Sequence, residues 1–443
     1  MKRLLAIAGA GMVAAAISLA PVQKAHAEGT LSLCWAAWDP ANALVELSKD
    51  FEKANNIKMS FNFVPWPNFT DRMQNELNSK GKLCDLIIGD SQWIGGAAEN
   101  GQYVKLNDFF QKEGISMDDF MPATVVGYSE WPKNTPNYWA LPAMGDALGW
   151  VYRKDWFAKP DLQAAFKAKY GRDLAVPTSW EELKDIAEFF QGREVDGKKR
   201  YGVSIFTERG SEGITMGAAA ALYDYGFDYQ DPGKPYAMDG FVNSPGAVKG
   251  LEMYKSIFKC CTPPGYTDAY MQEGLDAFKS GQVAMMMNWF AFWPGMYKDP
   301  DVGGDKIGFF SNPPENGKQF TMLGGQGISV VAYSDHKDDA LKYIKWFASA
   351  DVQKKWWALG GYSCAKSVLN DPSFQSSQPF AGEFLKSMGF VKDFWAEPTY
   401  VQLLQAEQKR LHDFVVADQG TAKDALDGLV KDWTGVFQDA GKL

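Results

Sequence analysis

The hydrophobic and polar positions of this chain alternate between two periods. Residues 31–35 alternate apolar and polar side chains, which predicts a strand, and residues 44–51 repeat apolar side chains at helical spacing. Residues 59–63 alternate again, residues 69–77 return to the helical spacing, and residues 83–88 form a short apolar run that suits a buried parallel strand. This order of elements predicts an α/β fold with a doubly wound sheet.

The second half of the chain continues the alternation with different segment lengths, so we find no repeat of fixed period. No low-complexity linker divides the chain, and any second domain must be reached through ordered crossings. The predicted elements are a helix over 180–190 with a capping box at Ser179, a strand over 201–206, a helix over 270–279, a strand over 283–287, helices starting at Asp335 and Asp351, and a closing helix over 421–439.

Aromatic and polar residues follow two of the predicted strands. Residues 35–39 (Trp-Ala-Ala-Trp-Asp) follow the first strand, and residues 90–93 (Asp-Ser-Gln-Trp) follow the third. In a doubly wound sheet, ligands bind in the crevice beyond the carboxyl ends of the strands. The sequence therefore predicts a ligand site near these two segments.

The N-terminal segment has the three parts of a secretory signal peptide: a basic start, an apolar run over 4–20, and the cleavage signal Ala25-His26-Ala27. We expect residues 1–27 to be removed and the mature chain to begin near Glu28. A membrane anchor is the alternative, but the run is short and rich in Ala and Gly, and no cysteine follows the cleavage point to carry a lipid. We therefore expect a soluble protein, exported to the periplasm, with no direct membrane insertion.

The charge balance is acidic, with 54 acidic and 45 basic residues and a formal net charge of −9. Removal of Lys2, Arg3 and Lys24 with the signal peptide makes the charge more negative still. This balance argues against binding to nucleic acid or to an anionic membrane surface. A neutral or cationic small ligand is easier to reconcile with it.

Five cysteines are present, which is an odd number, and none are in C-x-x-C spacing, so they indicate neither a zinc site nor a redox motif. Adjacent cysteines pair only with strain. We therefore expect a disulfide from Cys260 or Cys261 to Cys364, with Cys34 and Cys84 as buried thiols. The alternative is that all five are buried free thiols.

Catalytic motifs are nearly absent from the sequence. His336 and His412 lie on predicted polar helix faces without a second ligand at metal-binding spacing. There is no G-x-S-x-G elbow and no Walker loop, and the glycine cluster over 324–327 lacks the third glycine of a dinucleotide site. We therefore expect no catalytic residue, no metal and no cofactor, and a protein that is not an enzyme. Paired carboxylates of a glycosidase stay open, because 54 acidic residues always offer pairs.

Aromatic residues are conspicuous: 16 Trp, 18 Tyr and 29 Phe, many of them at predicted strand ends. Sugar rings present apolar C–H faces and hydroxyl edges, so a sugar site needs aromatic platforms beside polar side chains. Core packing is the alternative for any one aromatic residue, and it is favoured for Trp180, Trp346 and Trp433 on amphipathic helix faces. The clusters that fit a sugar site are Trp35 and Trp38 with Asp39, Asp90 with Gln92 and Trp93, Asp146 near Trp150, and Asn288 with Trp289.

Several of these segments, taken in order, resemble one protein family. They are the strand ending in Trp38-Asp39, the segment Asp90-Ser91-Gln92-Trp93, residues 139–142 leading into 145–155, residues 277–285 (AFKSGQVAM), the glycine-rich residues 324–330, residues 340–349, and Gly361-Tyr362-Ser363. In this order they resemble the family 1 extracellular solute-binding proteins of bacterial ABC importers, the maltose-binding-like group. The similarity spans nearly the whole mature chain. Each motif alone is loose, but their order is specific.

The resemblance implies a two-lobed α/β fold, the periplasmic-binding-protein fold of type II, with three hinge crossings. It places the crossings near residues 144–146, 286–288 and 329–333. The N-terminal lobe would comprise residues 28–143 plus 287–331, and the C-terminal lobe residues 144–286 plus 332–443.

The resemblance also implies that ligand is enclosed between the lobes and that the closed form is presented to a membrane permease. Partners would be a small-molecule carbohydrate and the permease subunits of an ABC transporter, and we expect a monomer. Hydroxyl groups would bind Asp39, Gln92, Asp146 and Asn288, while Trp38 and Trp289 would stack on the sugar. The full set of predicted ligand-binding residues is Trp38, Asp39, Asp90, Ser91, Gln92, Trp93, Asp146, Asn288, Trp289, Gly325 and Tyr362.

Two alternatives to a carbohydrate-binding protein remain. The same scaffold could bind a polyol, a glycerol phosphodiester, an opine or a betaine; a phosphate would need cations or helix N-termini in the cleft, and a quaternary amine would need an aromatic cage. The other alternative is a secreted glycosidase or lyase.

Overall fold

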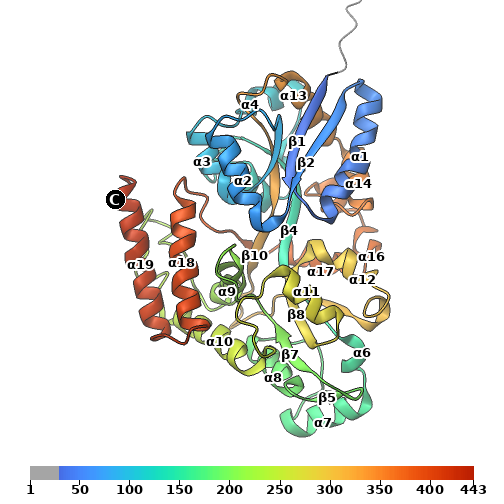
Figure 1. Ribbon diagram of the computed structural model, residues 1–443, viewed down its shortest axis with the longest axis vertical. Helices are drawn as coiled ribbons and strands as arrows, with labels where there is room; N and C mark the ends of the chain where they lie inside the picture. Colours follow the sequence, from blue (N-terminus) through green and yellow to red (C-terminus); the bar gives the residue numbers. More distant parts are fainter. Residues whose placement is uncertain (1–28) are drawn as a thin grey trace, which may run out of the picture.

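One continuous sheet runs through the molecule in the computed structural model, which describes residues 29–443 (Figure 1). Its strand order is β2-β1-β3-β10-β4-β8-β7, with β9 beside β4 and β11 beside β10, and a separate hairpin pairs β5 (Glu194–Val195) with β6 (Lys198–Lys199). The predicted signal peptide, residues 1–27, lies outside the described residues. The strands of the sheet are β1 (Thr30–Ala36), β2 (Lys58–Val64), β3 (Leu86–Asp90), β4 (Leu141–Tyr152), β7 (Tyr201–Ser204), β8 (Val283–Trp289), β9 (Gly308–Ser311), β10 (Thr321–Val330) and β11 (Val391–Lys392).

Helices surround the two ends of this sheet and make two lobes, the first at the top and the second at the bottom of Figure 1. The helices of the first lobe are α1 (Asp39–Asn55), α2 (Trp66–Asn78), α3 (Ile94–Glu99), α4 (Asn107–Glu113), α5 (Pro122–Tyr128), α13 (Lys337–Phe347), α14 (Ala350–Ala358) and α15 (Lys366–Leu369). Those of the second lobe are α6 (Lys154–Phe157), α7 (Pro160–Tyr170), α8 (Trp180–Phe190), α9 (Gly213–Asp224), α10 (Pro245–Cys261), α11 (Met271–Lys279), α12 (Trp293–Tyr297), α16 (Phe374–Ser377), α17 (Ala381–Met388), α18 (Tyr400–Val415) and α19 (Ala422–Asp439).

The first lobe confirms the predicted β-α-β-α-β order. Strand β1 pairs in parallel with both β2 and β3, as expected when helices make the crossovers. Helix α2 buries Phe69, Met73 and Leu77, which are the apolar positions whose helical spacing predicted it. The carboxyl ends of these three strands therefore meet at one edge of the sheet.

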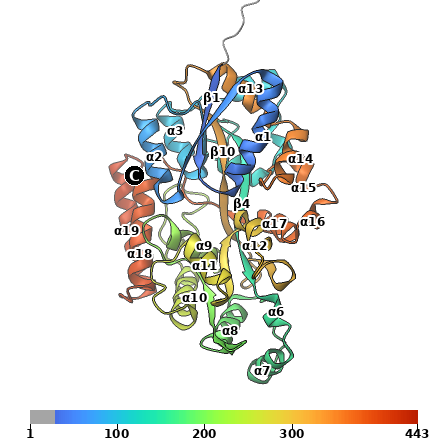
Figure 2. The same cartoon turned by 45° about the vertical axis from the view of Figure 1, so that its right-hand side comes forward.

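Two long strands link the lobes. Strand β4 pairs with β10 through residues 141–147 and with β8 and β9 through residues 148–152, while β10 also pairs with β3 through residues 326–330. Figures 1 and 2 both show β4 and β10 running from the first lobe into the second. Because each strand is hydrogen-bonded in both lobes, this pair sets the position of one lobe relative to the other.

In the second lobe, two predicted helix starts are confirmed with their capping bonds. The Ser179 side chain accepts a hydrogen bond from the Glu182 backbone N–H, and Thr421 and Asp424 form a complete capping box. The predicted start at Asp335 is wrong: His336 is the residue before α13, and the Asp335 carboxylate instead lies 3.1 Å from Lys82 Nζ. An ion pair with a neighbouring loop replaces the cap there.

Two segments lie in a different lobe from the predicted division. Helix α13 packs on α1, where the Ser48 and Tyr343 hydroxyls hydrogen bond at 2.7 Å and the Phe51 and Tyr343 rings lie 4.9 Å apart, so residues 332–369 stay with the first lobe. Strand β9 pairs with residues 149–152 of β4, so residues 290–311 stay with the second lobe. We therefore propose that the third link between the lobes is the segment between α15 and α17, with β8 remaining wholly in the second lobe.

The disulfides correct the predicted pairing. Cys34 is bonded to Cys84, with the Cα atoms 5.6 Å apart. Cys34 lies on β1 and Cys84 lies just before β3, and these two strands pair with each other, which brings the cysteines within disulfide distance. Cys260 is bonded to Cys261, although adjacent cysteines were expected not to pair. Cys364 has a buried free thiol. Its backbone carbonyl accepts a hydrogen bond from the Met121 N–H in the first lobe, whereas Cys261 lies at the end of α10 in the second lobe, so the two cysteines are in different lobes.

Helix α18 carries a carboxyl group with an unusual environment. Glu407 is fully buried, and both of its carboxyl oxygens lack a hydrogen-bond partner among residues 29–443. Burial raises the pKa of this group well above its usual value, because charge is disfavoured away from water.

We also find that no helix within residues 29–443 is long and apolar enough to cross a membrane.

We expect peptide mapping of the unreduced protein to recover Cys34 linked to Cys84, and Cys364 in alkylated, unlinked form. The bond closes a loop with a sequence separation of 50 residues. In the chain-entropy model such a loop contributes about 4 kcal/mol, so replacing both cysteines by serine should lower the free energy of unfolding by up to that amount. Recovery of Cys34 linked to any other cysteine would contradict the pairing.

We expect Glu407→Gln to raise the free energy of unfolding at pH 8 more than at pH 5. A carboxyl pKa that is raised in the folded state costs stability as pH rises above the unfolded pKa, by up to about 1.4 kcal/mol per pH unit until the folded pKa is reached. The glutamine carries no such cost. Urea unfolding at both pH values measures the difference, with the exposed Glu252→Gln on α10 as the control; equal gains at pH 5 and pH 8 would refute the explanation.

Candidate ligand-binding site

A narrow cavity lies between the two lobes, beyond the carboxyl ends of β1, β2 and β3. Its wall contains three tryptophans, three acidic residues and two glutamines. The first lobe contributes Trp38, Trp66, Asp90, Ser91 and Gln92; the linking strands contribute Asp146, Leu323, Gly324, Gly325 and Gln326; and the second lobe contributes Glu212, Met216, Met271 and Trp289.

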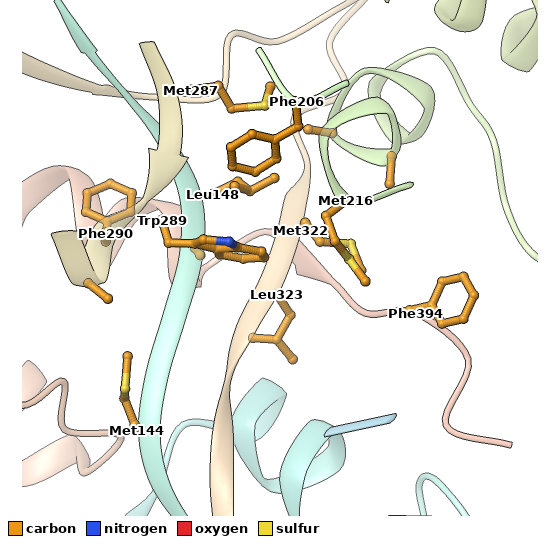
Figure 3. Packing of buried hydrophobic residues seen from close by; sticks show 14 of the residues in the cluster. Met144, Leu148, Phe206, Met216, Met287, Trp289, Phe290, Met322, Leu323 and Phe394 are labelled. Carbon is orange, nitrogen blue, oxygen red and sulfur yellow. The ribbon is translucent and has the colours of Figure 1, made fainter. Parts of the chain in front are cut away.

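The parallel arrangement of the first three strands places the first-lobe residues. Trp38 follows β1, Trp66 follows β2, and residues 90–92 lie at the end of β3, so all reach the same sheet edge. The Trp38 and Trp66 rings pack against each other with centroids 5.6 Å apart. Trp289, at the end of β8, faces them from the second lobe; Figure 3 shows its ring lying across β4 and β10, between Leu148 and Leu323. The cavity thus has indole surfaces from both lobes.

Two glycines of β10 make room for these side chains. A Cβ atom on Gly324 would lie 2.5 Å from the Trp289 ring, so the ring occupies the space of the missing side chain. Gly325 has φ +88°, a left-handed conformation that glycine adopts without steric cost, and a Cβ there would lie 2.2 Å from the Met144 carbonyl oxygen. Both residues are therefore needed for β10 to approach β4 and Trp289 this closely.

Of the eleven predicted ligand-binding residues, the structure brings seven together around the cavity, and their binding role remains a prediction. These seven are Trp38, Asp90, Ser91, Gln92, Asp146, Trp289 and Gly325.

The other four lie outside the cavity wall, and three of them support it from behind. The buried Asn288 amide donates to the Met271 carbonyl at 3.0 Å, and the Tyr362 hydroxyl donates to the Phe290 carbonyl next to Trp289. Trp93 is buried and packs on Phe69, with ring centroids 5.1 Å apart. Asp39 begins α1 with an exposed side chain.

Sequence reasoning missed seven residues of the wall. Trp66 follows a predicted strand at the same sheet edge, so the rule that selected Trp38 could have found it. Glu212 and Met216 lie at the start of α9, where the sequence offers no ligand signal. The missed residues are Trp66, Glu212, Met216, Met271, Leu323, Gly324 and Gln326.

Asp90 is the first of three buried carboxyl groups in the wall. One oxygen accepts a hydrogen bond of 2.6 Å from Gln326 Nε2, while Oδ2 has no partner in the part of the chain that the structure describes. Burial raises the pKa of Asp90 to about 7, and the nearby Asp393 carboxylate adds to the increase.

Glu212 and Asp146 differ in how much hydrogen bonding they have. Burial, followed by repulsion from Asp90 and Glu208, raises the pKa of Glu212 well above its usual value, and no described residue donates a hydrogen bond to its carboxylate. Burial also raises the pKa of Asp146, but Asp146 Oδ1 accepts from the backbone N–H groups of Ala147 at 2.8 Å and Ala291 at 3.3 Å. Asp146 therefore fixes the turn after Trp289 through its backbone partners.

Direct polar contacts hold the lobes together beside the cavity. The Ser91 hydroxyl donates to Asp393 Oδ1 at 3.1 Å, and Lys133 Nζ lies 3.8 Å from Asp393 Oδ2. Asp393 follows β11, and its own carbonyl accepts a hydrogen bond from Tyr223 of α9 in the second lobe. Asp393 is thus a link from the second lobe to two residues of the first.

The cavity wall carries no basic side chain among the described residues. Lys133, the lysine that pairs with Asp393, donates to the carbonyls of Val126 and Gly127. It lines a neighbouring hollow that has Leu323 in common with the cavity. Within residues 29–443 no three His, Cys, Asp or Glu side chains converge in a way that could hold a metal ion. The wall therefore offers indole faces and hydrogen-bond acceptors to its ligand.

Comparison with solved structures confirms the two-lobed fold of a type II periplasmic binding protein. The maltose-bound MalE3 of T. maritima is 22% identical, with a TM-score of 0.77 over 92% of this chain and 99% of that one. A ribitol-bound ABC transporter solute-binding protein of Agrobacterium radiobacter K84 is 23% identical, with a TM-score of 0.75 over 92% and 99% of the two chains.

Sequence comparisons agree with the fold. A probable ABC transporter-binding protein of Deinococcus radiodurans is 27% identical over 314 residues, which cover 70% of this chain and 69% of that one. A probable amino-acid ABC transporter periplasmic-binding protein of Sinorhizobium fredii is 23% identical over 76% of this chain and 73% of its own. The family model described as "Bacterial extracellular solute-binding protein" matches residues 37–354, and the chain belongs to that family.

Proposed function

We propose that this protein is the periplasmic solute-binding component of an ABC importer and that it captures a carbohydrate or polyol between its lobes for delivery to the membrane permease. The observation that carries the proposal is the cavity wall, in which Trp38, Trp66 and Trp289 surround acceptors on Asp90, Gln92 and Glu212. Indole rings stack on the C–H faces of sugars, and carboxylate and amide oxygens accept hydrogen bonds from hydroxyl groups.

The same wall argues against the anionic alternatives. A glycerol phosphodiester or an opine would place its anionic groups beside Asp90, Asp146 and Glu212, and no described residue of the wall supplies a compensating positive charge. A betaine or an amino acid has the same difficulty with its carboxylate. The ligands named for the solved relatives, maltose, ribitol and α-D-tagatose, are neutral hydroxylated molecules.

Access to the cavity supports capture by closure of the lobes. One neighbouring hollow shares Trp38, Trp66 and Met271 with the cavity, and a second neighbouring hollow shares Leu323. Because these openings lie between lobes that Asp393 holds together, separation of the lobes would widen them. Binding of solute would then favour the closed form that a permease recognises. Binding without catalysis and a monomeric state remain part of the proposal.

We expect a panel of sugars and polyols to contain at least one compound that raises the melting temperature, because a ligand bound only to the folded state stabilises it. Trp289→Leu should raise the Kd for that compound about 10-fold by removing a stacking surface. Trp346→Leu on α13, half-buried and outside the cavity, is the control and should leave the Kd unchanged. Calorimetry measures both values.

A Trp289→Leu variant with unaltered affinity would refute the site. Conversion of the bound compound into products, in proportion to protein concentration, would refute a pure binding function and favour the glycosidase alternative.

We expect Asp393→Ala to open the ligand-free protein and to speed dissociation of the bound compound, because the contacts of Ser91 and Lys133 to Asp393 are lost. Small-angle scattering should show a larger radius of gyration for the ligand-free variant than for the unmodified protein, and saturation should compact both. Exposed Asp371→Ala is the control. A radius of gyration that neither this variant nor the ligand changes would contradict closure of the lobes.

A further inference from the structure

Two of the three buried side-chain atoms that lack a partner in the described cavity wall are hydrogen-bond acceptors. Gln92 is 6% exposed, and its Oε1 has no partner among the described residues; its Nε2 faces Asp393 Oδ1 at 3.5 Å, which fixes the orientation of the amide. Asp90 Oδ2 is buried without a partner among residues 29–443, and Glu212, across the same cavity, is 8% exposed. Trp38 Nε1 is the one unpartnered buried donor that the described part of the wall offers.

The ionisable side chains in the described cavity wall are all acidic. Asp90 and Glu212 come from opposite lobes and repel each other, and Asp393 and Glu208 add to the repulsion. Burial raises the pKa of both groups because no cation compensates them, and a cation bound between them would lower those values again. A neutral sugar would supply hydrogen bonds to these groups but would leave their pKa values raised.

Within residues 29–443, no three acidic, histidine or cysteine side chains converge in a way that could hold a metal ion. The carboxylates come from both lobes and from a linking strand, so they suit a molecule with several separated donor groups. A quaternary ammonium would supply charge but no N–H donor for Asp90 Oδ2 or Gln92 Oε1. A primary or secondary ammonium supplies both.

We propose that the ligand is an amino sugar or amino alditol, whose protonated primary or secondary amine lies between Asp90 and Glu212 while its hydroxylated skeleton packs against Trp38, Trp66 and Trp289. This proposal rests on the proposed function and specifies its substrate class. Indole faces attract a cation as well as sugar C–H groups, so the aromatic wall suits both parts of such a molecule.

Matched pairs of probes test the proposal on the full mature chain by calorimetry at neutral pH. D-glucamine is compared with D-glucitol, and D-glucosamine with D-glucose and with N-acetyl-D-glucosamine, which keeps the nitrogen but not its charge. We expect each amine to bind at least about 10-fold more tightly than its neutral partners, because charge-assisted hydrogen bonds are stronger than neutral ones. Equal affinity within a pair would overturn the proposal and leave the proposed function standing, whereas no binding by any of these or by a wider sugar and polyol panel would count against both.

Two isosteric variants identify the groups responsible. Asp90→Asn and Glu212→Gln should each weaken binding of the amine more than binding of its neutral partner, and so remove most of the preference for the amine. Asp108→Asn, exposed on α4, is the matched control and should keep the preference. An equal loss for amine and neutral probes would overturn the proposal, because the two acids would then act as ordinary acceptors. Should a variant fail to fold, the probe pairs on the unmodified protein still decide the question.

Discussion

The antiparallel pairing of β4 with β10 sets the geometry on which the other features of this protein depend. Both strands are hydrogen-bonded in each lobe, so the lobes can rotate against each other only as far as these strands bend. Gly324 and Gly325 let β10 come within contact of Trp289 and Met144 at this point. Asp146 lies on the facing stretch of β4, so the cavity wall includes the part of the sheet that joins the lobes.

The cavity concentrates carboxyl groups that weaken the fold. Asp90, Asp146 and Glu212 are buried, and burial of a carboxylate without a cation is unfavourable. Asp90 accepts a hydrogen bond from Gln326, and Asp146 accepts hydrogen bonds from backbone N–H groups. The Glu212 carboxyl group has no such donor among the described residues. Sequences violate the rules of stable packing chiefly at functional sites, which is why the proposed site includes Glu212.

Several residues near the cavity hold the segments that line it in place and do not line it themselves. Asn288 holds the start of α11 by its bond to the Met271 carbonyl, and Tyr362 holds the turn after Trp289 through Phe290. Family resemblance selected these positions as contacts with ligand, and the structure shows them one layer farther out. A side chain locked by packing and hydrogen bonds keeps the residue in front of it in place, which a binding site requires.

The sequence by itself determined the local elements and the edge of the sheet at which the site lies. Apolar spacing identified β1, β2, β3 and the buried face of α2, and capping residues identified the starts of α8 and α19, because these depend on neighbours within a few positions. Only the tertiary structure decided that Cys34 pairs with Cys84, that α13 packs on α1, and that Glu212 and Asp90 line the same cavity. Those outcomes depend on contacts between segments far apart in the chain, whose distances are set by strand order and lobe closure and leave no periodic trace in the sequence.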